Sequence, residues 1–454
     1  MSAQASAAVT PDVALKGDSS VFRAGVFSRH FNANNKGNVG RLGNENDNYI
    51  ELSPSVTLAE VDGTDWRFTT TFAMQSQENG AWQSTDDNNL NFANLQAFLR
   101  VTGLLDSDKG AALWVGKKYV RSDSHLVDNF WRDVSGNGAG IENLSLGSGK
   151  LRANWTRRDD ARDFELIHSG YSTKDGVGDD GKPKSVNKPS RTATNMFDVE
   201  YGFAPFDSSW ASVGYTLVAP QRYASEYSNY GYKLKEEVGN SHLFTAVLGE
   251  SLLGGWNNTV VRYVKGSTAG SGFGNHVWTS SEDSSSYNID IIDFGTVNFT
   301  ENFNMLYHTW FNFSKVKNSL DNKETQGRDF QLVLRPQYKL TKMTRIMLEA
   351  GMFTGSSDTT VFGDESERGN TQQQKLTLAY GITPDAGNAW SRPEIRFFAT
   401  YKHFGHNEGR TGTYGNGFTV NLMDKATSGA STVDSLSDGR KTEFYFGVQA
   451  EAWF

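Results

Sequence analysis

Polar and apolar residues alternate along the chain in stretches of roughly eight to thirteen residues, and helical periodicity is nearly absent. Because successive side chains of a β-strand point to opposite faces, each stretch predicts one strand with a polar and an apolar face. The pattern therefore predicts an all-β protein of about 18 strands. The predicted strands begin near Val21, Tyr49, Asp65, Phe92, Ala111, Gly149, Arg162, Met196, Ser209, His242, Trp256, Asp290, Asn302, Arg328, Met343, Gln373, Ser391 and Thr442.

The last predicted strand shows its two faces most plainly. One face carries Phe444, Phe446, Val448, Ala450, Ala452 and Phe454. The other face carries Glu443, Tyr445, Gly447, Gln449, Glu451 and Trp453. The first set suits lipid and the second suits water, as in a strand that crosses a membrane within a barrel. The alternative is a strand of a soluble β-sandwich, which also has one polar face.

The connections between the predicted strands are of two alternating kinds. Short turns occur at 61–64, 205–208 and 340–342, and long polar loops occur at 32–48, 119–148, 265–287 and 403–440. Bacterial outer-membrane barrels have tight turns at one rim and long loops at the other. A propeller would instead repeat with a period of about 40–50 residues, which the chain lacks. The connections therefore predict a transmembrane antiparallel β-barrel with both termini on the short-turn side.

Composition fits a barrel once the alternation is taken into account. The 454 residues carry a formal net charge of −8, no cysteine and a mean hydropathy of −0.54. This polar average suggests a soluble protein, but barrel strands never build the ~20-residue apolar run of a spanning helix. Mild acidity argues against nucleic acid as a partner. Residues 1–20 lack the apolar stretch of a secretory signal, so we expect a mobile lead-in before a single barrel domain at 21–454.

Three aromatic residues fall on polar faces of the predicted strands, where apolar side chains are unexpected. Tyr49 shares its face with Glu51, Trp453 shares its face with Glu451, and Trp390 continues the polar face of the stretch that follows it. A sugar ring has C–H patches on its faces and hydroxyls at its edge, so aromatic rings beside charged groups match both. These positions indicate a sugar path through the lumen. The alternative is an aromatic belt at the membrane interface.

The stretch 117–142 is too polar and too rich in glycine for a strand, and too long for a turn. Inside a barrel, such a loop can fold inward and narrow the pore. Charged residues of both signs are then predicted to line the constriction: Arg121, Asp123, Asp128, Arg132 and Asp133. The alternative is a solvated outer loop. His125 lies between carboxylates, but a lone histidine is no metal site, and we predict none.

Five segments, in the same order along the chain, resemble the maltoporins. They are RLGNENDNYIEL at 41–52, ALWVGKKY at 112–119, GNGAGIENLSLGSGKL at 136–151, WSRPEIRFFATY at 390–401 and FGVQAEAWF at 446–454. The resemblance covers almost the whole chain after residue 20. It implies a trimeric barrel of about 18 strands in a Gram-negative outer membrane. It also implies an inward third loop and passive diffusion of maltose, maltodextrins or related sugars.

The resemblance further implies roles for particular residues. The family's aromatic slide falls on Tyr49, Trp82, Phe273, Trp390 and Trp453, with Trp82 contributed to a neighbouring subunit's vestibule. Its polar track and constriction fall on Arg23, Arg41, Glu51, Arg121, Asp123, Asp128 and Phe130. Departures occur at Val21 and Phe130, where the family has tyrosines, and at Asn91, where an arginine is expected. These departures leave the preferred sugar open between maltodextrins and sucrose or aryl-glucosides.

Three classes of function compete on the sequence alone. A sugar-specific porin needs neither catalysis nor a cofactor, and its partners are the sugar, outer-membrane lipid and further copies of the chain. A general diffusion porin would have the same fold, with the aromatic residues incidental. An outer-membrane enzyme would need a reactive group, and no nucleophile motif such as G-x-S-x-G is present. Block of the ion current by oligosaccharides separates the first two classes.

Overall fold

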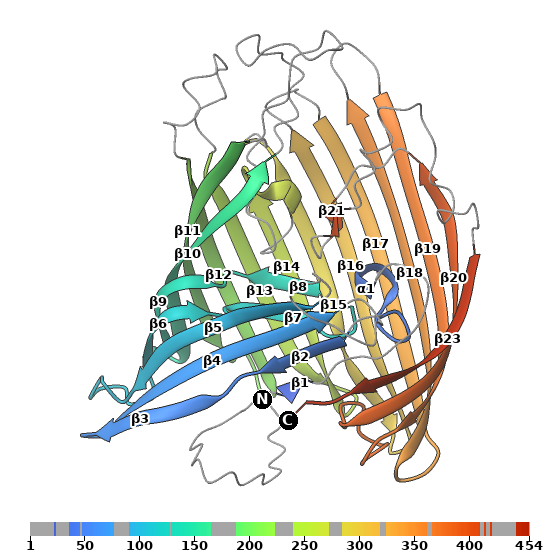
Figure 1. Cartoon of the computed structure of the whole chain (residues 1–454), viewed down its shortest axis with the longest axis horizontal. Coiled ribbons are helices and arrows are strands. Elements are labelled where there is room, and N and C mark those ends of the chain that lie inside the picture. Colours follow the sequence, from blue (N-terminus) through green and yellow to red (C-terminus); the bar gives the residue numbers. More distant parts are fainter. Residues whose placement is uncertain are drawn as a thin grey trace.

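Antiparallel strands make up nearly all of the computed structural model (Figure 1). The structure describes residues 22–23, 36–45, 48–76, 90–127, 129–164, 188–222, 239–271, 284–317, 324–360, 366–408, 413–414, 418–419 and 442–453. The large sheet contains β1 (Phe22–Arg23), β2 (Asn48–Leu52), β3 (Ser55–Val61), β4 (Thr64–Ser76), β5 (Asn91–Thr102), β6 (Ala112–Lys118), β9 (Gly136–Leu146), β10 (Gly149–Phe164), β11 (Lys188–Phe203), β12 (Ser209–Arg222), β13 (Ser241–Leu252), β14 (Gly255–Lys265), β15 (Tyr287–Thr300), β16 (Phe303–Lys317), β17 (Glu324–Lys339), β18 (Thr344–Thr360), β19 (Ser366–Ile382), β20 (Glu394–Glu408) and β23 (Thr442–Glu451). The other elements are α1 (Lys36–Val39), β7 (Arg121–Ser124), β8 (Asn129–Asp133), η3 (Ala269–Ser271), β21 (Thr413–Tyr414) and β22 (Phe418–Thr419).

The strands of the large sheet follow one another antiparallel around the wall, from β1 to β23. The sheet has 19 strands by its hydrogen bonds, but β2 and β3 both pair with β4 and are separated only by Ser53 and Pro54. Because β2 and β3 form one interrupted strand, the wall has 18 strands. The predicted antiparallel barrel, which curls around an internal space, is thereby confirmed (Figure 1).

One predicted strand is misplaced. Arg162 lies inside β10, and the strand that the prediction omits is β9, within the stretch predicted to be loop. Alternate positions of β9 are glycines, at Gly136, Gly138 and Gly140, so no alternation of polarity is visible there. Glycine is required at Gly138, where a Cβ would lie 1.9 Å from the carbonyl oxygen of Trp155. The inward loop consequently ends at residue 135, before β9 begins.

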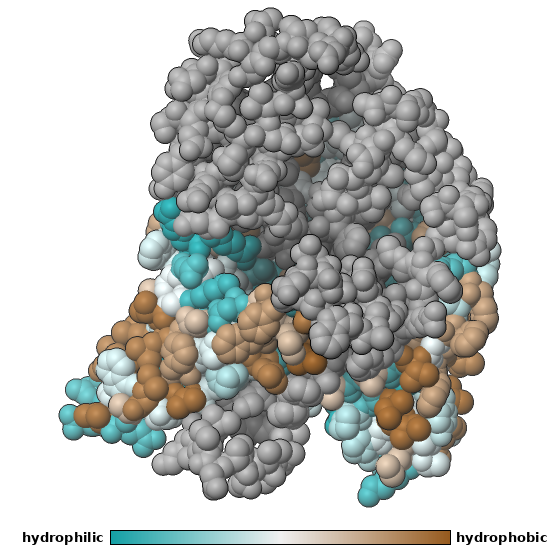
Figure 2. All heavy atoms as spheres, in the orientation of Figure 1, coloured by the Kyte–Doolittle hydropathy of each residue, from teal (hydrophilic) through white to brown (hydrophobic). Residues whose placement is uncertain are grey.

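The two faces of the wall have the polarity of a membrane barrel. On β23, Phe444 and Phe446 are 69% and 75% exposed, whereas Glu443 and Gln449 are buried. Apolar residues likewise gather on the outer surface above the lower rim (Figure 2). Such a surface suits hydrocarbon, because apolar area left in water costs roughly 25 cal/mol per Å². The lipid-facing and lumen-facing sides predicted for the last strand are confirmed.

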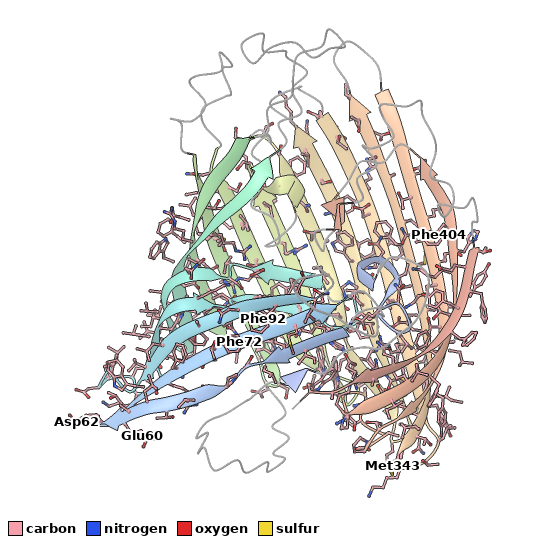
Figure 3. All side chains as sticks on the ribbon, viewed as in Figure 1. Glu60, Asp62, Phe72, Phe92, Met343 and Phe404 are labelled. Atoms are coloured by element: carbon pink, nitrogen blue, oxygen red, sulfur yellow. The ribbon has the colours of Figure 1, made fainter. Side chains whose placement is uncertain are left out.

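Short turns gather at one end of the barrel. The turns that contain Asp62 and Met343 project from the lower end (Figure 3), and β23 descends toward the same end (Figure 1). The strand ends that lead into the longer connections lie at the opposite end. This confirms the asymmetry of turns and loops, while the lead-in predicted at 1–20 lies outside the described residues. Among the helices that the structure describes, none has the length and apolar character to cross a membrane.

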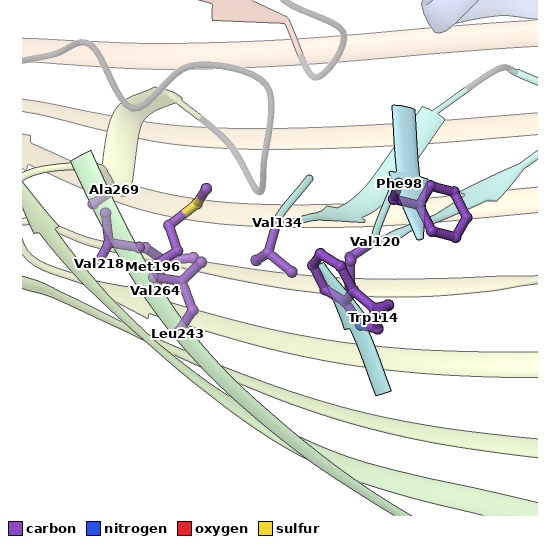
Figure 4. Close-up of a cluster of buried hydrophobic side chains, with 9 residues drawn as sticks. All are labelled: Phe98, Trp114, Val120, Val134, Met196, Val218, Leu243, Val264 and Ala269. Carbon is purple, nitrogen blue, oxygen red and sulfur yellow. The ribbon is translucent and has the colours of Figure 1, made fainter. Parts of the chain in front are cut away.

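Among the described residues, the β7–β8 hairpin and residues 36–45 leave the wall and enter the lumen. β7 and β8 pair as a hairpin between β6 and β9, which confirms an inward loop at this place. At its base, Val120 and Val134 pack with Trp114 and with apolar side chains of β11 to β14 (Figure 4). The second segment is 36–45, here called the inner segment, which includes α1. The sequence predicts an outer loop at 32–48, but the structure buries the inner segment against the barrel wall.

Candidate functional site

Arg132 of the β7–β8 hairpin anchors the hairpin to the inner wall. Its guanidinium donates to both carboxylate oxygens of Asp198 on β11, at 2.6 and 2.5 Å, and also pairs with Glu200. The side chains of Arg132 and Asp198 are 1% and 0% exposed. The prediction that Arg132 lines the open constriction is therefore wrong. The hairpin turns this charge toward the wall, where a buried guanidinium requires carboxylate partners.

Two further hydrogen bonds hold the hairpin from other strands. Arg262 on β14 donates to the carbonyl oxygen of Trp131 at 2.7 Å. Ser124 and the imidazole of His308 on β16 form a hydrogen bond of 2.8 Å. Because the attachments lie on three separate strands, the hairpin cannot move away from the wall without losing several bonds at once. It is a fixed part of the lumen.

A buried charged cluster on β17, β18 and β19 holds the inner segment. Glu349 accepts a hydrogen bond from the backbone N–H of Leu42 at 3.0 Å. Lys375 donates to the carbonyl oxygens of Gly40 and Leu42, both at 2.8 Å. Glu349 is also paired with Lys375 and Arg335, each at 2.6 Å. Only glycine fits at Gly40, where φ is +92° and a Cβ would lie 2.5 Å from Glu349.

Arg41 joins the inner segment to the hairpin and to the last strand. Its backbone N–H donates to the carbonyl oxygen of Leu126 at 3.2 Å, and its guanidinium lies 3.0 Å from a ring nitrogen of His125. It is paired with Glu45 at 2.6 Å and with Glu451 on β23 at 3.3 Å. The narrowed part of the lumen is therefore built jointly from three regions that are far apart in the sequence.

A row of aromatic rings runs through this part of the structure. The ring of His125 lies 5.2 Å from that of Trp453 and 5.3 Å from that of Trp390. Trp390 stacks on Trp256 at 6.0 Å, and Trp256 meets Phe294 edge-on at 5.9 Å. Two of the predicted tryptophans are thus brought together by a histidine of the hairpin. A row of flat aromatic rings offers a stacking surface for ligands with apolar faces.

Charged groups lie directly beside these rings. The guanidinium carbon of Arg392 lies 4.1 Å from the ring centre of Trp453. Glu451 accepts hydrogen bonds from Arg392 at 3.0 Å and from Arg396 at 2.7 Å, which places two cations on one buried carboxylate. Ionic hydrogen bonds of this kind fix the orientation of the side chains that make them. Donors and acceptors are therefore held in place next to the ring faces.

A second group of predicted residues meets where the hairpin leaves the wall. Tyr49 donates a hydrogen bond to Glu51, both on β2. The guanidinium carbon of Arg121 lies 4.6 Å from the ring centre of Phe130 and 3.6 Å from that of Tyr119. The charge of Glu51 also acts on Tyr119. The structure therefore brings Arg121 and Phe130 together beside Tyr119, which the prediction did not include, and joins Tyr49 to Glu51 on β2.

The structure describes some of the other predicted residues and not the rest. Arg23 on β1 lies opposite Glu51 in the pairing register, and Asp123 is exposed on β7. Asp133 is paired with Arg158 at 2.9 Å. Outside the described residues lie Trp82, Phe273 and Asp128. Within the part of the chain that the structure describes, no group of three or more His, Cys, Asp or Glu side chains is placed to hold a metal ion.

Sequence reasoning missed the inner segment, Trp256 and Tyr119 as contributors to the lumen. A signal for the first was present, since Val39 and Leu42 are apolar residues within a polar stretch, and both are 0% exposed in the structure. Trp256 shares its strand face with Arg262, which is buried in the lumen wall. Tyr119 gave no comparable signal, because it belongs to no alternating stretch.

Comparisons with known proteins give the following matches. The sequence model of the LamB porin family matches residues 20–454. Maltoporin 2 of Yersinia pestis is 28% identical over 427 residues, which covers 92% of this chain and 88% of the relative. Maltoporin 1 of Klebsiella pneumoniae is 28% identical over 431 residues, with the same two coverages of 92% and 88%. Among solved structures, OccAB2 of Acinetobacter baumannii has 8% identity and a TM-score of 0.45, and the match covers 96% of each chain.

The antiparallel barrel, its apolar exterior and its narrowed, charged lumen define a porin of the Gram-negative outer membrane. Such a protein is a channel and not an enzyme. The chain belongs to the LamB porin family. Within that class, the family match and the maltoporin relatives make it an outer-membrane sugar porin.

Proposed function

We propose that this porin passes maltodextrin-type oligosaccharides by passive diffusion along an aromatic track flanked by polar groups. The observation that most supports this is the row of rings from Trp453 through His125 to Trp390, beside Arg392 and Glu451. The relatives named maltoporins favour the same class of sugar. The proposed aromatic track comprises Tyr49, Trp82, Phe273, Trp390 and Trp453. The proposed polar track comprises Arg23, Arg41, Glu51, Arg121, Asp123 and Asp128.

The chemistry of the sugar explains why both tracks are needed. A maltodextrin is a chain of pyranose rings, each with apolar C–H faces and an edge of hydroxyls. Indole faces cover the C–H patches, and charged side chains bond the hydroxyls about twice as strongly as neutral groups do. The buried ion pairs of Arg41 with Glu45 and Glu451 hold its side chain before the sugar arrives, so little rotamer freedom is lost on binding. A succession of similar weak sites lets the sugar both enter and leave.

A preference for sucrose or aryl-glucosides is the second candidate. It is favoured by Phe130, which has no hydroxyl and contacts Arg121. The discriminating experiment measures block of the ion current in planar bilayers by maltotriose, sucrose and an aryl-glucoside. Strongest block by maltotriose supports the proposal, and strongest block by either other sugar supports the second candidate. Absence of block by every sugar would identify a general diffusion pore.

Truncation of the track should weaken sugar binding. We expect Trp390→Ala and Trp453→Ala each to reduce affinity for maltotriose by about 1–3 kcal/mol, the range for a base stacked on an aromatic side chain. The reason is that alanine removes the flat surface that the sugar face covers, and leaves the neighbouring charges in place. Conductance in salt without sugar should stay the same or rise slightly. Titration of the current block measures both quantities.

The matched control is Trp155→Ala, since Trp155 is 43% exposed on the outer face of β10. This variant should keep the sugar affinity of the unmodified protein. If Trp390→Ala and Trp453→Ala both behave like this control, the aromatic-track proposal is wrong.

We further propose that three copies assemble side by side. Phe72 and Phe92 stack at 5.8 Å on the outer side of β4 and β5, and Trp82 lies in the connection between these strands (Figure 3). Exposed aromatic surface beside such a connection suits contact with a neighbouring barrel. Native mass spectrometry in mild detergent should therefore show a trimer, and Trp82→Ala should weaken sugar block. A strictly monomeric protein with full sugar block would contradict the proposal.

A further inference from the structure

Tyr119 directly follows β6, at the point where the hairpin leaves the wall. Its backbone N–H donates to the side-chain oxygen of Gln96 on β5 at 2.9 Å. Gln96 in turn donates to the hydroxyl of Thr71 on β4 at 2.8 Å. These bonds tie the backbone of Tyr119 to the wall, so the side chain starts from a fixed position beside the constriction.

Tyr119 and Phe130 both contact the guanidinium of Arg121, at 3.6 and 4.6 Å between the guanidinium carbon and the ring centres. A guanidinium over an aromatic face is stabilised by the charge distribution of the ring. Its N–H groups point outward in the guanidinium plane and remain able to donate to a ligand. Phe130 therefore supports Arg121, and part of its ring surface is used for this contact.

The phenol of Tyr119 remains protonated at neutral pH. Burial raises the pKa of Tyr119, which lies outside the strands of the wall, and Arg121 opposes the rise, while the carboxylates of Glu51 and Asp133 add to it. The guanidinium carbon of Arg121 lies 3.6 Å from the ring centre of Tyr119, so the phenol stands beside a charged donor. A protonated phenol both donates and accepts a hydrogen bond, which matches the hydroxyl of a sugar.

We propose that Tyr119 is a specificity-determining residue of the constriction. Its hydroxyl bonds a sugar hydroxyl beside Arg121, and thereby supplies the phenolic group that Phe130 lacks. Phe130 is a positioning residue that orients Arg121. The inference rests on the proposed sugar transport, and it assigns part of the sugar preference to the base of the hairpin.

The test compares Tyr119→Phe with the unmodified porin in planar bilayers, with maltotriose and a set of monodeoxy maltosides as blockers. Tyr119→Phe keeps the ring over Arg121 and removes one oxygen. We expect about a three- to tenfold loss of maltotriose affinity, the usual effect of one hydrogen bond. One monodeoxy maltoside lacks the hydroxyl that Tyr119 is proposed to bond. The unmodified porin and Tyr119→Phe should bind this sugar with equal affinity. Phe130→Tyr in the Tyr119→Phe background should recover part of the affinity.

Tyr201→Phe is the matched control, because the Tyr201 hydroxyl bonds the carbonyl oxygen of Leu146 at the turn between β9 and β10. This variant should bind every sugar as the unmodified porin does. An equal loss for all sugars in Tyr119→Phe would indicate a structural role and overturn the inference. Unchanged affinity in Tyr119→Phe, with normal block of the unmodified porin, would overturn the inference alone. Absence of block in the unmodified porin would overturn the proposed function together with it.

Discussion

Glu349→Gln is expected to destabilise the barrel by about 3–5 kcal/mol, because it leaves buried cations without their counter-charge. Glu349 is 0% exposed and is paired with Arg335 and Lys375. Glutamine has nearly the same shape, so the change removes charge and little volume. Denaturant unfolding of the protein in detergent micelles measures the free energy, and single-channel conductance should rise as the inner segment loosens.

The control for this substitution is Glu324→Gln. Glu324 pairs with Lys315 at 2.9 Å, but the two side chains are 28% and 34% exposed. Exposed pairs contribute about 0–1 kcal/mol, so the control should unfold almost like the unmodified protein. Equal unfolding free energies for Glu349→Gln and Glu324→Gln would show that the buried cluster does not anchor the inner segment.

Arg132→Met should have an effect of similar size at the hairpin. Methionine preserves the length of the side chain, but it leaves Asp198 buried without its guanidinium partner, and within the described residues the hydroxyl of Thr216 still donates to it at 2.7 Å. Loss of one partner of a buried pair typically costs about 3–5 kcal/mol. The hairpin also loses its attachment to β11, so we expect higher conductance, a noisier open-channel current and weaker sugar block.

Two variants separate loss of charge from release of the hairpin. Arg152→Met also removes a guanidinium that pairs with Glu200, at 3.0 Å. Arg152 lies on strand β10 of the wall and not on the hairpin, so the hairpin stays attached and the open-channel current should stay quiet. Combining Arg132→Met with Asp198→Asn removes both buried charges, so much of the stability should return while the hairpin stays loose. A quiet current of normal size in Arg132→Met would refute the anchoring role of Arg132.

The strands of the wall could be predicted because lipid and water impose opposite demands on alternate residues. On β23 this rule identifies both faces correctly, from Phe444 to Glu451. It fails at β9, where Gly136, Gly138 and Gly140 carry no side chain for either environment to act upon. It predicts one strand from Tyr49 to the turn at 61–64 but not its interruption at Ser53 and Pro54, since the break depends on the pairing with β4.

Within the candidate site, only the residues on strands of the wall could be predicted from the alternation of polar and apolar positions. Trp453 follows the lumen-facing parity of its strand, and its ring lies, like that of Trp390, within about 5.3 Å of the ring of His125. The partners of an inward segment depend instead on which distant strands face it across the lumen. Arg132 finds its carboxylates on β11, and the inner segment finds Glu349 on β18. No local pattern carries that information, because the curvature of the whole sheet determines it.

The bond between Arg41 and Glu451 joins residues 410 positions apart in the chain. Neighbouring strands of the wall, by contrast, pair with segments that lie much closer to them along the chain. Contacts across long stretches of chain form slowly, since a large loop must close before they are made. We therefore expect the narrowing of the lumen to be completed late in assembly, after both ends of the chain have entered the sheet.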